Sequence, residues 1–294
     1  MTKFHLQGER NMALVAILFC LALQRFANVG GWFQALWFEA YLRRLSPFLV
    51  KLDQRLIILA VIAPVLLVFL LLHLIFTWRL FGLFDLILAM AVLFFCIDAR
   101  DLKSKLTPYF TSLEKADMHM ASSAVSDFIS DTSVGNMADL HRAVTRAILL
   151  RSFEQLFTGL FWFMIFGVYG VATYFLMTLL RQNALKVNPN YVGVAKLAAQ
   201  IQDGLEWLPS RLLGFSYALA GHFNKGFSYC MKNMWSGLSD VKKFTVESGL
   251  AALDINSSSA DADQSENQAA LDLINRVLII WLIALALILV GILL

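Results

Sequence analysis

The chain has 294 residues, of which 59% are hydrophobic and 15% charged, and its formal net charge is +3. An average soluble domain has about 45–50% apolar and about 25% charged residues, so a globule of this composition would lack the charges to cover its surface. The mean hydropathy of +0.67 therefore excludes an ordinary soluble enzyme, a disordered chain and a disulfide scaffold. The composition predicts an integral membrane protein, whose first partner is the lipid bilayer.

A membrane-spanning helix needs about 20 predominantly apolar residues. The first apolar run is short and follows Lys3 and Arg10, which allows two interpretations: a first span, which we favour, or an interfacial helix. The second and third runs are joined by a short link, and we expect them to form a helical hairpin. The fold class is thus an all-α polytopic membrane protein with four or five transmembrane helices. The candidate spans are 12–23, 56–76, 80–97, 156–180 and 277–294.

The segments between the spans are mostly helical. Apolar residues recur at helical spacing through 98–151, which we expect to be a helical cytoplasmic loop. A helix is predicted over 191–207, and Pro209 suits the first turn of another. The nearly uncharged run 212–223 is short for a crossing and fits a buried or re-entrant helix. Ser, Asp, Asn and Gln dominate 254–270, which predicts a flexible acidic linker.

The distribution of Lys and Arg orients these spans, because cytoplasmic loops carry an excess of both. With the N-terminus outside, the inside loops 24–55 and 98–155 hold five and seven Lys or Arg residues. Three lie outside, apart from nine in the long segment 181–276, which counts for little because long loops obey the rule poorly. The count favours a multi-pass protein with its N-terminus outside and its C-terminus inside.

Signatures of well-known active sites are absent from the sequence. It contains no P-loop, no G-x-G-x-x-G, no H-E-x-x-H and no G-x-S-x-G. The five histidines show no ligand spacing, and the three cysteines form no C-x-x-C pair. We expect no metal, no cofactor and no catalytic residue of these known kinds, and the small net charge gives no reason to expect a nucleic-acid partner.

Charged residues at the edges of the spans are the candidates for a ligand-binding polar pocket. Arg100 and Asp101 follow the third span, where a helix cap with an ion pair is the simpler interpretation. Arg151 and Glu154 are three residues apart, and so share a helix face where the fourth span begins. A carboxylate at the membrane edge is uncommon and often functional, although it also snorkels easily to the interface.

A second group of candidates follows the fourth span. Asp203 and Glu206 share a helix face, and paired carboxylates serve acid–base chemistry or metal binding. Neutralisation of Arg211 at a helix corner is the simpler role for both acids. His222 follows Gly221 near a predicted helix C-terminus, where the helix dipole favours a partly positive imidazole.

Two motifs in this region resemble those of a known family. Residues 206–214 read E-W-L-P-S-R-L-L-G and residues 217–223 read Y-A-L-A-G-H-F. Together they are similar to the W-[IL]-P-x-R-L…Y-A-L-x-G-H signature of AmpE, within the AmpE/CobD/CbiB family of bacterial inner-membrane proteins. The L-F-W-F at 160–163 resembles that family's L-F-W segment, and the order of elements agrees. The resemblance is loose over nearly the whole chain and specific from Trp207 to His222.

The resemblance distinguishes two branches of this family. CobD/CbiB proteins are cobalamin-pathway synthases that attach an aminopropanol group to a corrinoid carboxylate using ATP, with motifs that include G-R-D-T and D-D-V-x-N-W-x-P-A-R. This chain has no G-R-D-T and reads Q-D-G-L-E at 202–206, so that Asp203 and Arg211 match the second motif but its first Asp and its Asn do not. The departures point to the AmpE branch, which is linked to β-lactamase induction as a proposed membrane signal transducer.

We therefore expect an AmpE-like regulatory or accessory protein in cell-wall signalling, with a small molecule or a muropeptide as candidate ligand. A divergent CobD/CbiB-like adenosylcobinamide-phosphate synthase is the first alternative. A small-solute or muropeptide transporter is the second, although no internal repeat supports it. The five-span orientation leaves one difficulty: Arg100 and Glu154 are inside, whereas 203–222 falls outside, so a shared pocket needs a different sidedness or a re-entrant 212–223.

Overall fold

A computed structural model describes residues 32–49, 52–77, 83–96, 99–115, 118–126, 128–129, 136–255 and 263–291. Every regular element within these ranges is a helix, as expected for an all-α membrane protein. The predicted span 12–23 lies outside the described residues. Two compact units make up the chain: Met1–Asp98 with Gly159–Leu205, and Ala99–Thr158 with Glu206–Leu294. Among the described residues, three helical stretches are long and apolar enough to cross a membrane: Gln54–Leu74, Met137–Val187 and Gln264–Leu287.

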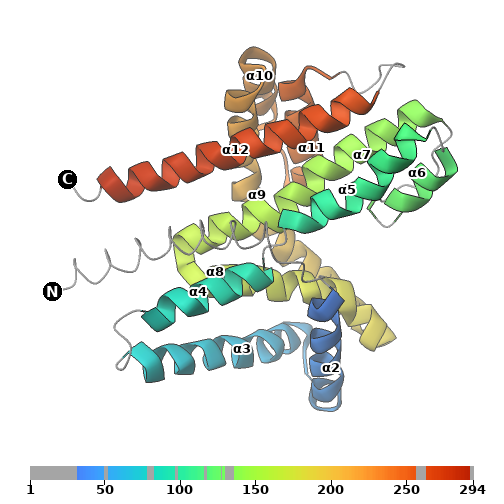
Figure 1. Ribbon diagram of the computed structural model, residues 1–294. Coiled ribbons are helices and arrows are strands. Elements are labelled where there is room, and N and C mark those ends of the chain that lie inside the picture. Colours follow the sequence, from blue (N-terminus) through green and yellow to red (C-terminus); the bar gives the residue numbers. More distant parts are fainter. Residues whose placement is uncertain are drawn as a thin grey trace. The chain divides into compact units, whose positions relative to one another are not determined.

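The first unit contains the predicted hairpin. Helix α3 (Gln54–Thr77) and helix α4 (Leu83–Cys96) lie side by side (Figure 1). With 14 residues, α4 is about 21 Å long, shorter than the ~30 Å hydrocarbon core. Helix α2 (Trp32–Leu49) precedes the hairpin, and the Tyr41 hydroxyl donates to the carbonyl of Val61 at 2.9 Å. Buried apolar side chains of α2 and α3 share one core with those of residues 176–198.

The predicted span 156–180 is not one continuous helix. It lies in α8 (Thr158–Val187), which is interrupted at Gly167, where φ is 60° and ψ is −143°. Only glycine adopts this conformation readily. A Cβ on Gly170 would lie 2.4 Å from the carbonyl oxygen of Trp162, whereas eight residues of straight helix separate two positions by about 12 Å. The chain therefore folds back at Gly167, and the apolar run makes two arms.

Helix α9 (Val192–Ala220) follows a break at Asn188, whose side chain accepts from the amide of Asn190 at 3.0 Å. The predicted helix 191–207 is present, but it does not end before Pro209. That proline lies inside α9, so 212–223 is largely the second half of the same helix. A hydrogen bond from a side chain to the carbonyl of Leu205 compensates for the missing amide of Pro209.

The second unit holds the predicted loop 98–151, which is helical: α5 (Ala99–Glu114), α6 (Met118–Val125) and α7 (Met137–Ser152). Helices α10 (Phe223–Asn233) and α11 (Val241–Leu253) pack together. Helix α12 (Gln264–Gly291) begins inside the predicted linker 254–270, of which residues 256–262 lie outside the described part of the chain.

Helices α7 and α12 run alongside each other in the same direction (Figure 1). Near their starts, the Thr145 hydroxyl donates to Asn267 Oδ1 at 2.6 Å. About three turns further along, the rings of Phe157 and Trp281 meet with centroids 5.3 Å apart. The two helices therefore enter their apolar stretches from the same end.

Candidate functional site

The helix that carries Arg151 and Glu154 changes geometry at these residues. Helix α7 passes into a π-helical turn, Phe153–Phe157, before α8 begins. The amide of Thr158 bonds to the carbonyl of Phe153, and the Thr158 hydroxyl donates to the same oxygen at 3.0 Å. Such π-turns are rare and frequently mark functional sites, because they re-aim side chains.

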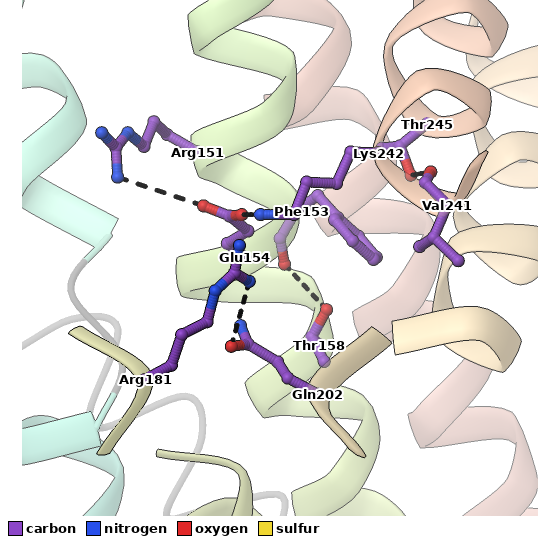
Figure 2. A network of polar contacts seen from close by, with 9 residues as sticks. All are labelled: Arg151, Phe153, Glu154, Thr158, Arg181, Gln202, Val241, Lys242 and Thr245. Atoms are coloured by element: carbon purple, nitrogen blue, oxygen red, sulfur yellow. Dashed lines mark hydrogen bonds and ion pairs between the residues drawn. The ribbon is translucent and has the colours of Figure 1, made fainter. Parts of the chain in front are cut away.

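Glu154 is the centre of an ion-pair network (Figure 2). One carboxylate oxygen contacts Lys242 Nζ, and the other lies 4.0 Å from Arg151 Nη1. The Glu154 side chain is only 16% exposed, against 33% for each of the two cations. We call Arg151, Glu154 and Lys242 the Glu154 centre.

Lys242 was not expected from the sequence, because it lies 88 residues from Glu154. A second ion pair joins the same two helices, α7 and α11, between Arg146 and Glu247 at 3.0 Å. The signal in the sequence is that both helices have the same charge order, with a cation before an acid. Along α7 and its π-turn Arg146 precedes Glu154, and on α11 Lys242 precedes Glu247. This order becomes informative only when the antiparallel packing is known.

Arg211 is buried, with 3% of its surface exposed, and it holds the segment after α10. Its guanidinium donates to the carbonyls of Met234 and Ser236, both at 2.9 Å, and to the Ser236 hydroxyl at 2.8 Å. It also stacks over the ring of Phe244 at 3.9 Å and over that of Trp207 at 5.2 Å. These contacts give Arg211 of the W-L-P-S-R-L motif a structural role.

The surroundings of Arg211 shift several pKa values. Burial lowers the pKa of Arg211, while Cys230, Tyr229 and Asp240 act in the opposite direction. Burial also raises the pKa of the Cys230 thiol to about 11, so this thiol stays protonated at neutral pH. Asp240 is the carboxylate whose charge raises the pKa of Arg211.

The two acids of α9 have different environments. Glu206 is fully buried, whereas Asp203 is half-buried one turn earlier. Within the first unit, the Arg181 guanidinium donates to Gln202 Oε1 at 3.2 Å and ties α8 to α9 (Figure 2). In the part of the chain that the structure describes, no group of three or more His, Cys, Asp or Glu side chains could hold a metal ion.

Trp162 of the L-F-W-F segment compensates for Pro209. Because proline has no amide hydrogen, the carbonyl four residues earlier, that of Leu205, lacks its helical partner. The indole N–H of Trp162 donates to this oxygen at 3.1 Å. The L-F-W-F segment thus contacts α9 one turn before Pro209.

His222 follows the end of α9, as expected, but it also begins another helix. It occupies the N-terminal cap position of α10, and its amide donates to the carbonyl of Ala252 at 2.7 Å. A side chain at Gly221 would meet this same carbonyl oxygen at 2.3 Å. The G-H pair of the motif therefore joins α9 to the end of α11, and the His222 side chain is exposed.

Arg100 and Asp101 lie in the first turn of α5, but their side chains are outside the described part of the structure. A buried polar network that the sequence did not indicate connects α5, α7 and α12. Tyr109 Oη lies 2.7 Å from His141 Nδ1, and Asn267 Nδ2 donates to Tyr109 Oη at 2.9 Å. Burial raises the pKa of Tyr109, so this hydroxyl remains protonated in its network.

Comparisons with known proteins agree with the motif analysis. A family model described as "Regulatory signalling modulator protein AmpE" matches residues 12–294. A protein named "Cobalamin biosynthesis protein CobD" from Chromobacterium violaceum is 31% identical over 146 residues, 49% of this chain and 47% of that protein. One of the same name from Stutzerimonas stutzeri is 30% identical over 131 residues, 44% of this chain and 43% of that protein.

The chain thus spans less than half the length of these curated relatives. No solved structure matches it. The family model, in contrast, extends from the first apolar run to the last residue and includes both motifs and the Glu154 centre. The chain belongs to the AmpE family of regulatory signalling modulators.

Proposed function

We propose that the protein acts in the bacterial inner membrane as a regulatory modulator of β-lactamase induction and cell-wall signalling. The observation that carries the proposal is the Glu154 centre: a largely buried carboxylate on a π-turn, shared between two cations where an apolar helix begins. The family match supports the regulatory role. The cell-wall pathway comes from the resemblance of the motifs.

The centre has the chemistry of a ligand-responsive switch. Glu154 belongs to the α7–α8 helix and Lys242 to α11, so their ion pair links two elements that are distant in the sequence. A muropeptide or another small carboxylate would compete with Glu154 for Lys242 and Arg151. Such competition would weaken the α7–α11 contact. A local change in charge pairing would thereby shift the equilibrium between two arrangements of the packed helices.

The first unit supports a cytoplasmic location for the segment that follows α8. The Tyr191 hydroxyl donates to the carbonyl of Ser46 at 3.5 Å, and the side chain of Gln54 lies against Gly193. The start of α3 and the start of α9 are therefore at the same end of this unit. The reversal at Gly167 has the same consequence, because both ends of a hairpin return to one side of the membrane.

The second unit supports the same side independently. Because α7 and α12 enter their apolar stretches from one end, Gln264 shares the side of the loop 98–151. The nine Lys and Arg residues of 181–276 then join the twelve already expected inside, and three remain outside. We accordingly infer a C-terminus outside, and not inside as the sequence predicted; the sidedness difficulty for 203–222 disappears.

The proposal is tested by β-lactamase induction in a strain that lacks the protein and carries a plasmid-borne copy. We expect Glu154→Gln and Lys242→Gln each to lower the β-lactam-induced activity about tenfold. Such a change corresponds to a coupling free energy within the usual range of ~1–3 kcal/mol. Arg146→Gln is the matched control, because it breaks the more exposed ion pair of the same two helices and should change induction less than about twofold. Normal induction by both Glu154 centre variants, at normal protein level, contradicts the proposal.

A divergent cobinamide-forming synthase is the second candidate, favoured by the similarity to the two CobD proteins. Expression in a strain that lacks this synthase tests it, with growth on the corrinoid acid precursor as readout and the amidated product as positive control. Under the regulatory proposal we expect growth on the product only. Growth on the acid precursor would establish the synthase activity.

A further inference from the structure

Helix α10 exposes an apolar face that the proposed function does not use. Phe223, Phe227 and Met231 follow each other at four-residue spacing and are 49%, 39% and 52% exposed. Trp235, just after the helix, is 83% exposed. The adjacent face, with Gly226 and Cys230, is buried. Contiguous exposed apolar side chains of this size mark a contact surface.

The start of α10 lies at the level where α12 enters its apolar run. Arg276, the last charged residue before 277–294, donates to the carbonyl of Ala220 at 3.2 Å, three residues before α10. One turn along α12, the indole of Trp281 donates to the Ser216 hydroxyl at 2.9 Å. Both Arg and Trp are typical of the membrane–water interface.

The other end of α10 lies at a second boundary. Arg211 holds the carbonyls of Met234 and Ser236, and a short turn, Leu238–Asp240, then leads to α11. Lys242 at the start of α11 contacts Glu154, the last charged residue before the apolar run from Leu156. Both ends of α10 are thus anchored beside residues that border apolar runs, and in Figure 1 α10 runs across α12, not along it.

The segment that contains α10 carries only basic charges of its own, and one of its lysines, Lys225, pairs with Asp254 just after α11. From Arg211 to Ser239 the sequence contains Arg211, Lys225 and Lys232 but no acid. Both lysines are exposed. A helix with an aromatic-rich apolar face and a basic polar face binds in the plane of a membrane surface, and is attracted by anionic lipids.

We propose that α10 is an interfacial helix on the anionic cytoplasmic leaflet of the same bilayer. Phe223, Phe227 and Met231 lie at the boundary between headgroups and acyl chains, and Lys232 lies among the headgroups. The helix then fixes the depth of the segment held by Arg211 and of the start of α11. Neither signalling nor enzymatic activity is required for this role, so the inference stands or fails separately from the proposed function.

Fluorescence quenching in nanodiscs tests the depth of α10. The full chain, with Cys20, Cys96 and Cys230 changed to Ala, receives one new cysteine by Phe227→Cys or Met231→Cys, labelled with a polarity-sensitive fluorophore. Asn224→Cys and Ser228→Cys, exposed positions on the polar face, are the matched controls. We expect a lipid-bound nitroxide to quench the apolar-face labels at least about twofold more than the controls, and aqueous iodide to show the reverse order.

Equal iodide quenching at all four positions would place the helix in water and overturn the proposal. Protection of the Phe227 and Met231 labels from both quenchers would also overturn it, because a protein partner or a second copy would then cover this face. Nanodiscs with and without phosphatidylglycerol test the charge component. Nitroxide quenching should increase with the anionic lipid, and Lys232→Gln should reduce that increase; quenching that is independent of lipid charge would exclude recognition of anionic headgroups.

Discussion

Pro209 illustrates how single residues in this protein are explained only by contacts with distant ones. The sequence predicts a helix boundary at this position, because proline favours the first turn of a helix. The structure continues the helix, because the indole of Trp162 takes the place of the missing amide at the carbonyl of Leu205. Arg211 is a second example. It is a cation in a family motif, and its hydrogen bonds to the backbone carbonyls of Met234 and Ser236 explain its role.

A double-mutant cycle tests the pairing of Trp162 with Pro209. Trp162→Phe keeps an aromatic ring but removes the donor, and should lower the free energy of unfolding by about 1–3 kcal/mol. In a Pro209→Ala background the new amide can bond to the carbonyl of Leu205, so the same change should cost about 1 kcal/mol less. Equilibrium unfolding in mixed micelles gives both values. Identical losses in the two backgrounds would show that the indole does not compensate for the proline.

The helices themselves were largely predictable, but their interruptions were not. Apolar runs and helical periodicity located the α3–α4 hairpin, α12 and the helical loop 98–151. The same signals joined 156–180 into one span, since hydropathy does not detect a positive φ at Gly167. They also gave no sign of the π-turn at Phe153–Phe157, which arises from one extra residue in a helix of ordinary composition. Both interruptions are backbone features, to which composition is insensitive.

A substitution at Gly167 tests the reversal of α8. Gly167→Ala places a side chain where φ is 60° and ψ is −143°, and should lower the free energy of unfolding by about 1–3 kcal/mol through backbone strain alone, since nothing lies within 4 Å of the added Cβ. Gly204→Ala is the matched control: this glycine also has open space, but it lies inside α9, where alanine is the better helix former. We expect the control to be neutral or stabilising; equal stability of the two variants would argue against the reversal.

At the scale of the whole molecule, composition was enough to predict the fold class and the motifs were enough to predict the family. The sequence does not reveal the reversal at Gly167, from which we infer a changed parity for every later crossing. The candidate site was also only partly predictable from the sequence. Arg151 and Glu154 were identified by their spacing on one helix, whereas Lys242 required knowledge of which helices pack together.

C-terminal fusions test the inferred sidedness. Alkaline phosphatase is active only outside the inner membrane, and green fluorescent protein exported in an unfolded state does not fluoresce there. We expect an active phosphatase fusion and a dark fluorescent-protein fusion after Leu294, together with Asn190→Cys protected from an impermeant thiol reagent applied to intact cells. A bright fluorescent-protein fusion and a labelled Asn190→Cys would restore the orientation predicted from the sequence.

The regulatory role of the Glu154 centre is tested most directly by exchanging its charges. Glu154→Lys alone brings three cations together, and Lys242→Glu alone brings two acids together, so each should abolish most of the β-lactam-induced increase in β-lactamase activity. The double variant restores one opposite-charge pair between α7–α8 and α11, and we predict that it recovers at least part of the induction. A double variant no better than either single one, at equal protein level, or single variants that induce normally, would contradict the account.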